Sequence, residues 1–185
     1  MPELNNQNFN HLKIHTQYSI CEGAIKIDNL KDFCKEKKIP CLGISDTSNL
    51  CGALEFAENI SKVGTQPIIG TQIYFRFEDT TGLLPLIALN ENGYKRIIEL
   101  SSRSYLENDA LSDPHLDVKD LLIDTEGVSL LSGTIQGLFG KLFEKGRLDE
   151  ISKLYRSLSS KFNDNFYLEI QRHGDQNEIA FEKFN

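Results

Sequence analysis

Apolar positions along the chain follow two spacings, one typical of strands and one typical of helices. Short apolar runs predict strands near residues 10–15, 41–44, 67–77, 83–89, 128–131 and 166–170. Apolar residues three and four positions apart predict helices near 29–38, 50–63, 91–105, 118–122, 135–145 and 148–161, with a further helix from Asn177 onward. Because strands alternate with helices, the pattern indicates an α/β fold with a mainly parallel sheet.

Polar residues and glycines at the ends of these segments predict where helices begin and end. Asp28 and Asn90 can each accept a hydrogen bond from the first turn of a following helix, and Gly64 suits a helix C-terminus. Gly23 permits a tight path in the loop that follows the first strand, and residues 78–82 read as a turn. The inner face of the helix after Asn90 is expected to carry Tyr94, Ile97, Ile98, Ser101 and Tyr105.

Length and composition fit a single globular domain. The 185 residues are expected to form one domain at 9–185 after a flexible tail at 1–8. No apolar run reaches the roughly 18 residues of a membrane span, and the polar N-terminus does not resemble a signal peptide. The four cysteines form no Cys-x-x-Cys pair, which argues against a zinc knuckle and suits a reducing cytoplasm.

The net charge of −7 bears on possible partners. Affinity for DNA comes largely from neutralising phosphates, so an acidic chain is a poor nucleic-acid binder by itself. If the chain belongs to a DNA-processing protein, we expect DNA to be held by other parts of that protein.

Candidate chemistry gathers in the stretch His11-Leu12-Lys13-Ile14-His15-Thr16-Gln17-Tyr18-Ser19. In a strand, alternate side chains share a face, so His11, Lys13 and His15 point the same way. Imidazoles are common metal ligands and near-neutral acids or bases. Spacing alone also allows an ordinary solvated strand face, and the ammonium group of Lys13 works against binding of a cation.

Several ordered segments resemble one family. They are the stretch at 11–19, Ile44-Ser45-Asp46-Thr47-Ser48-Asn49-Leu50-Cys51-Gly52, Lys62-Val63-Gly64-Thr65-Gln66-Pro67-Ile68-Ile69-Gly70, and the later segments at 86–94, 130–133 and 166–174. Together they are similar to the N-terminal PHP (polymerase and histidinol phosphatase) domain of bacterial DNA polymerase III alpha subunits. The resemblance runs from about Phe9 to the last residue. It implies an α/β fold, namely a partial distorted (β/α)7 barrel of the PHP type, truncated at the C-terminus.

The resemblance also implies where a metal site would lie. Metal-binding members carry His-x-His, Asp-His and a later carboxylate, and those positions hold Lys13 with His15, Asp46 with Thr47, and Gln72. The vestigial candidates for metal binding are therefore His15, Asp46, Glu169 and His173, the last two keeping the pattern Glu-x-x-x-His. Lys13, Thr47 and Gln72 are departures. We expect Lys13 to stand where metal charge would lie and to pair with Asp46.

Two functions follow from the resemblance. In the first, the chain is a structural and subunit-docking domain of a replicative DNA-directed DNA polymerase, with no catalytic residue or cofactor of its own. The polymerase would use Mg²⁺ and bind DNA through its missing domains. Its partners would be its own polymerase core, the proofreading exonuclease and other replicase subunits, in the cytoplasm and without a membrane. In the second, the chain is an active phosphoesterase that uses Zn²⁺ or Mn²⁺, such as a 3′–5′ exonuclease, a pyrophosphatase or a histidinol-phosphatase-like enzyme.

Overall fold

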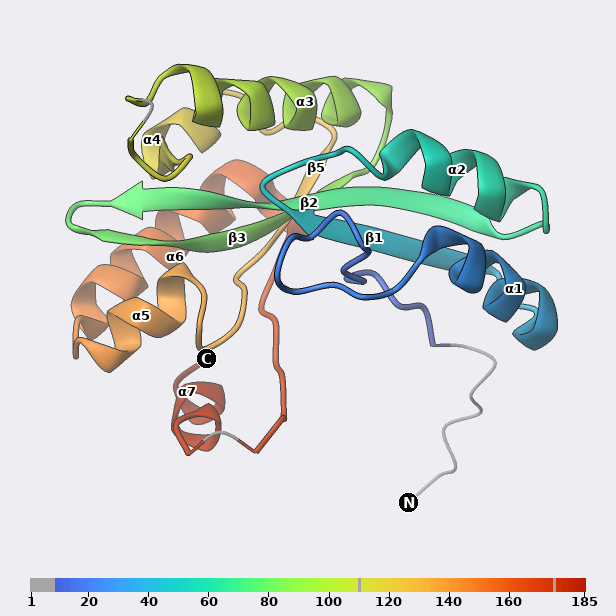
Figure 1. Cartoon of the computed structure of the whole chain (residues 1–185). Helices are drawn as coiled ribbons and strands as arrows, with labels where there is room; N and C mark the ends of the chain where they lie inside the picture. The colour runs from blue at the N-terminus through green and yellow to red at the C-terminus, as the bar shows by residue number, and fades with distance from the viewer. Residues whose placement is uncertain (1–8, 110, 175) are drawn as a thin grey trace. The chain divides into compact units, whose positions relative to one another are not determined.

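The computed structural model describes residues 9–109, 111–174 and 176–185, which belong to two compact units (Figure 1). The units are Met1–Thr71 and Gln72–Asn185, and the division between them falls inside one long strand, β2 (Gln66–Phe77). The flexible tail predicted at 1–8 lies outside the described residues.

The N-terminal unit packs two helices with one buried strand. Helix α1 (Ile27–Lys37) is followed by strand β1 (Cys41–Thr47) and helix α2 (Ala53–Ser61), and the start of β2 closes the unit. The two helices contact each other, and α2 also contacts β1. The core of this unit consists of the buried residues Ile27, Leu30, Cys34, Leu42, Ile44, Ala53, Phe56 and Ile60.

The strand predicted at 10–15 is shorter than expected. Only an isolated parallel bridge joins Ile14 to Ile44 of β1. The Gly43 amide donates to the carbonyl of His11 at 2.7 Å, so the chain still runs beside β1. A Cβ atom on residue 43 would lie 2.6 Å from the carbonyl oxygen of Leu12, and this close approach requires glycine.

Helix boundaries in this unit differ slightly from the sequence prediction. Helix α1 begins at Ile27, so the N-cap position belongs to Lys26, and the prediction of Asp28 as the cap is wrong. Burial of Ile27 draws the helix start forward, and Asp28 instead faces the positive end of the helix dipole in the first turn. Gly64 lies beyond the end of α2 with a φ of +81°, and its amide donates to the Ser61 carbonyl at 3.1 Å.

The C-terminal unit is built on a mixed sheet. Its strand order is β2-β3-β5-β6, where β3 is Thr80–Ala88, β5 is Val128–Leu131 and β6 is Phe166–Tyr167. The short strand β4 (Leu116–Asp117) pairs in parallel with β2, β5 pairs in parallel with β6, and β3 pairs antiparallel with β5. Two of these three pairings are parallel, in line with the expectation of a mainly parallel sheet, and the antiparallel pairing makes the sheet mixed. The predicted turn at 78–82 shrinks to two residues, and so tight a turn reverses the chain between β2 and β3.

Helices cover both faces of this sheet. Helix α3 (Glu91–Leu106) packs on one side of β3, and α5 (Leu138–Glu144) packs on the other beside α6 (Leu148–Phe162) (Figure 1). The short helix α4 (Val118–Leu121) follows β4, and a 3-10 turn at Asn163–Asn165 follows α6. The last helix, α7 (Glu178–Phe184), docks through Phe181 and Phe184 on Phe143, with ring centroids 5.4 and 5.5 Å apart.

Helix α3 buries a different face from the predicted one. The prediction of Asn90 as its cap is confirmed, because the Asn90 side chain accepts from the Gly93 amide at 2.9 Å. The buried residues, however, are Gly93, Arg96, Ile97, Leu100 and Ser104. Arg96 turns inward because its guanidinium donates to the backbone carbonyl of Asp120 at 2.6 Å. Ile98 and Tyr105, predicted to face inward, are 40 % and 53 % exposed.

Candidate functional site

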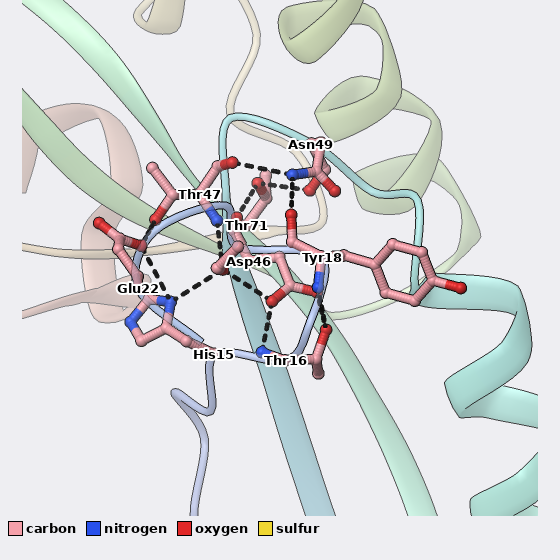
Figure 2. A network of polar contacts seen from close by, with 9 residues as sticks. His15, Thr16, Tyr18, Glu22, Asp46, Thr47, Asn49 and Thr71 are labelled. Carbon is pink, nitrogen blue, oxygen red and sulfur yellow. Dashed lines mark hydrogen bonds and ion pairs between the residues drawn. The ribbon is translucent and has the colours of Figure 1, made fainter. Parts of the chain in front are cut away.

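Asp46, at the end of β1, is the centre of a buried polar network in the N-terminal unit (Figure 2). Its side chain is 1 % exposed. One carboxylate oxygen accepts the Thr16 amide at 2.6 Å and the Ser19 hydroxyl at 2.8 Å, and the other accepts the Thr16 hydroxyl at 2.7 Å. The charge of Asp46 is thus met by three neutral donors of its own unit, which compensate for the cost of burial.

The donors reach Asp46 because the loop after residue 16 folds tightly back. Thr16 forms a parallel bridge with Ile25, and the Gln17 amide donates to the Ile25 carbonyl at 2.9 Å. Gly23 lies against Thr16 so closely that a Cβ atom on residue 23 would be 2.0 Å from the Thr16 carbonyl oxygen. The tight path predicted for Gly23 is confirmed, and it places the Thr16 and Ser19 side chains over the end of β1.

Hydrogen bonding also orients His15. Its Nδ1 atom lies 3.3 Å from the Ser19 hydroxyl and 3.7 Å from a carboxylate oxygen of Glu22. The single hydroxyl proton of Ser19 goes to the negatively charged Asp46 oxygen, so His15 must donate its Nδ1–H to Ser19. A carboxylate beside Nδ1 favours the same tautomer, which leaves Nε2 as the basic nitrogen of the neutral ring.

Two further polar residues tie the loop after β1 into the same network. The Thr47 hydroxyl donates to Glu22, and the Thr47 amide donates to the Ser19 hydroxyl at 3.0 Å. The Asn49 side-chain amide donates to the carbonyls of Tyr18 and Thr47, both at 2.9 Å. Both loops that reach Asp46 are therefore held to each other by side chain to backbone hydrogen bonds.

Tyr18 and Thr71 border this network. The Tyr18 hydroxyl donates to Glu55 at 2.6 Å, and this hydrogen bond, with burial, raises the pKa of the phenol. The Thr71 hydroxyl lies 2.6 Å from the backbone carbonyl of Asp46 and donates to it. Thr71 thus fixes the backbone of Asp46, whereas Thr16 and Ser19 hold its side chain.

Sequence reasoning missed Thr16, Ser19, Glu22 and Asn49 as members of this network. Serine, threonine and asparagine commonly form local hydrogen bonds, so their presence in a loop carries little information. The available signal was the polar run at 16–19 directly after the predicted strand, opposite a carboxylate at the end of the next strand.

The second group of predicted residues lies in the C-terminal unit, in the segment after β6. Glu169 is half-buried, and its amide donates to the Ser132 hydroxyl at 2.9 Å. His173 is exposed, and its amide donates to the Glu178 carboxylate at 2.8 Å. The side chain of Gln171 lies between them, because it donates to Glu169 at 2.7 Å and its oxygen is 3.2 Å from Nε2 of His173. Alternate positions 169, 171 and 173 share one side of an extended segment, so the pattern includes a glutamine that the sequence analysis did not single out.

Gln72, the remaining departure, is a buried residue of β2 with 5 % exposure. Its amide cannot supply the negative charge of a carboxylate at this position. Within the described ranges, no three His, Cys, Asp or Glu side chains gather in a way that could hold a metal ion. Over the same residues, no helix has the length and apolar character needed to cross a bilayer.

The family model named PHP domain matches residues 11–173, so the chain belongs to the PHP domain family. A metal-dependent phosphoesterase structure from Bifidobacterium adolescentis has a similar fold, with a TM-score of 0.57 at 12 % identity over 95 % of this chain and 82 % of that one. The fold predicted from sequence, a partial distorted barrel of the PHP type, is confirmed.

The similarity in sequence is to one kind of protein. The DNA polymerase III subunit alpha of Caulobacter vibrioides is 37 % identical over 98 % of this chain and 17 % of the relative. That of Thermus aquaticus is 34 % identical over 90 % of this chain and 15 % of the relative. The resemblance stated from the motifs is confirmed, and the chain spans about one sixth of the length of these relatives.

Proposed function

We propose that this chain is the PHP part of a replicative DNA polymerase, the DNA polymerase III alpha subunit, and serves there as a structural and subunit-docking domain with a degenerate metal site. The similarity to polymerase subunits over almost the whole chain supports the first half of the proposal. The observation that carries the second half is the set of three hydrogen bonds that Asp46 accepts from Thr16 and Ser19.

The residues of the N-terminal unit are a poor fit to a metal ion. A ligating carboxylate must direct a lone pair at the cation, and N–H or O–H donors already take three of the roughly four lone-pair sites of Asp46. The neighbouring position 47 offers a hydroxyl that donates to Glu22, where metal-binding relatives of the family carry an imidazole. Position 13 offers an ammonium group, which repels a divalent cation. We retain the proposal that Lys13 supplies positive charge near Asp46 in place of a metal.

In the whole protein, this domain would support the polymerase core and help to dock the proofreading exonuclease and other replicase subunits in the cytoplasm. Nucleotide addition would depend on Mg²⁺ held by carboxylates in parts of the protein outside this chain. These activities and partners are inferred from the polymerase relatives, of which this chain matches only a small part.

A second candidate function is metal-dependent phosphoester hydrolysis, and one feature of the site favours it. Donation from Nδ1 of His15 to Ser19 leaves Nε2 as the basic nitrogen, as in histidines that bind metals through one nitrogen and donate from the other. A single histidine of this kind can remain from an ancestral site, so this feature weighs less than the engaged carboxylate of Asp46.

The test compares the natural protein with a restored variant. We would measure bound metal by elemental analysis after purification without chelator, and Mn²⁺- or Zn²⁺-dependent hydrolysis of single-stranded DNA. The restored variant carries Lys13→His, Thr47→His and Gln72→Glu, and its matched control adds Asp46→Ala.

We expect less than about 0.1 metal ion per chain and no hydrolysis for the natural protein, because three replaced ligands should each weaken binding about tenfold or more. The restored variant should gain metal, and its Asp46→Ala control should lose it again. Two or three metals per natural chain, with hydrolysis abolished by Asp46→Ala alone, would replace the structural reading with the phosphoesterase reading.

A further inference from the structure

A groove of about 380 Å³ lies at the C-terminal end of α1, in the N-terminal unit. Its lining combines aromatic and basic side chains: Phe9 and His11 from the segment before β1, and Phe33, Lys37 and Lys38 from α1 and the residue after it. Among the residues that the structure describes, no acidic side chain lines it. None of these residues takes part in the network around Asp46.

The aromatic rings of the groove remain open to solvent. Phe9 is 64 % exposed and Phe33 is 39 % exposed, whereas the largest apolar side chains of this unit are fully buried. Phe9 meets the His11 ring edge-on, with centroids 4.8 Å apart, so it is held upright and not stacked flat on a neighbour. Ring faces placed in this way suit a flat, unsaturated ligand.

The charge around the rings is locally positive although the whole chain is acidic. Residues 31–40 contain four lysines and two acidic residues. Lys37 follows Phe33 by one helical turn, and therefore its stem lies on the same face of α1. Glu36 pairs with Lys37 at 2.6 Å, and Lys38 adds a second cation at the helix end. Because salt screens charges beyond about 8 Å, this local balance outweighs the distant acidic residues.

The groove is remote from the candidate metal site. It borders Pro40, directly before β1, whereas Asp46 lies near the other end of that strand. Six residues of extended chain span about 20 Å. Binding of a ligand in the groove would therefore be independent of metal binding at Asp46.

We propose that this groove binds single-stranded nucleic acid, with a base stacked against Phe9 or Phe33 and backbone phosphates near Lys37 and Lys38. Aromatic platforms beside cations are the usual means by which proteins hold unpaired strands without reading sequence. The proposal narrows the expectation drawn from net charge: the chain as a whole is acidic, whereas the described lining of this groove is basic and aromatic.

The first experiment locates the contact. The complete chain would be irradiated with a 12-nucleotide oligodeoxythymidine in which bromouracil replaces some bases, and cross-linked peptides would be identified by mass spectrometry. We expect cross-links on the peptides that contain Phe9 and Phe33. Cross-links confined to other peptides, or none at 50 mM salt with 100 μM protein, would overturn the proposal.

The second experiment measures affinity by fluorescence anisotropy with the same oligonucleotide, labelled. The double variant Phe9→Ala and Phe33→Ala should weaken binding about tenfold or more through lost stacking. The variant Lys37→Gln should lower the slope of log affinity against log salt by about 0.7. The matched controls are Tyr105→Ala and Lys95→Gln, an exposed aromatic residue and an exposed lysine on α3, which should leave both values unchanged.

All the altered side chains are exposed, so we expect each variant to fold. Circular dichroism would check this. Equal losses in the groove variants and the α3 controls would overturn the proposal, as would displacement of the oligonucleotide by an equal concentration of one deoxynucleoside triphosphate. Neither result depends on metal, so failure here leaves the proposed function standing, and metal-dependent hydrolysis at Asp46 would leave this groove untouched.

Discussion

The two groups of residues predicted as vestigial metal ligands are held in different ways. In the N-terminal unit, Asp46 is 1 % exposed and both of its oxygens are engaged by side chains and backbone of a folded-back loop. In the C-terminal unit, His173 is exposed, and the chain near it is fixed through backbone amides that donate to Glu178.

The two groups of candidate ligands therefore differ in how much the surrounding structure depends on them. A buried carboxylate with three donors cannot be removed without leaving those donors unpaired, so we expect Asp46 to stabilise the fold whether or not a metal binds. Replacing an exposed histidine has no comparable cost, because water can form hydrogen bonds with the groups that the histidine contacted.

The sharpest test of this contrast is a pair of substitutions. Asp46→Ala should lower the free energy of unfolding by about 3 kcal/mol or more, because buried N–H and O–H donors lose their acceptor. His173→Ala should cost less than about 0.5 kcal/mol. Urea unfolding followed by circular dichroism measures both, and Asp32→Ala, an exposed aspartate of α1, serves as the control for the loss of a charge. Equal effects at 46 and 173 would contradict the comparison.

The tight loop around Asp46 can be opened without touching the carboxylate. Gly23→Ala should cost about 2 kcal/mol, because its Cβ would lie 2.0 Å from a backbone oxygen and the loop must move away. Gly64→Ala is the matched control, because φ there is +81° but a Cβ meets nothing within 4 Å. It should cost only about 1 kcal/mol through backbone strain. A Gly23→Ala protein as stable as the Gly64→Ala protein would show that the loop does not need this close approach.

In the C-terminal unit, the contact between Glu169 and His173 runs through Gln171. Gln171→Ala should change the free energy of unfolding by less than about 0.5 kcal/mol, because Gln171 is only half-buried and one of its two partners, His173, is exposed. It should nevertheless alter the NMR shift of the His173 Nε2–H, which Gln171 accepts at 3.2 Å. Gln176→Ala, an exposed glutamine of the following loop, is the control. A large loss of stability would show that the fold depends on this segment as it is expected to depend on the network around Asp46, and would contradict the comparison.

The smallest expected effect is on how stability depends on pH in acid. The hydrogen bond from Arg76 holds the pKa of Asp117 below its usual value, with a further contribution from Lys119, while burial opposes the shift. Because the pKa is lower in the folded state, the stabilisation is present above the unfolded pKa of about 3.9 and is lost as the pH falls through the folded pKa.

NMR titration of Asp117 measures this effect directly. Arg76→Gln should raise the Asp117 pKa toward its ordinary value and reduce the loss of stability on acidification. Arg172→Gln, which breaks a separate ion pair with Glu182, should leave the Asp117 pKa unchanged. An Asp117 pKa that does not respond to Arg76→Gln would show that the carboxylate is ionised for another reason.

Periodicity, caps and ordered motifs are local properties of the chain, and they were enough to predict the order of the main helices and strands, the Asn90 cap and the family. The sequence also predicted that His15 and Asp46 belong to one polar site. The groups that donate to Asp46 could not be predicted from the sequence, because Thr16 and Ser19 are 30 and 27 residues away in the chain and the fold brings them together. The tertiary structure also decided the face of α3, where the backbone carbonyl of Asp120 draws Arg96 inward, and the mixed sheet, where a two-residue turn reverses β3. Distant hydrogen-bond partners and strand directions depend on the whole fold, and no local pattern specifies them.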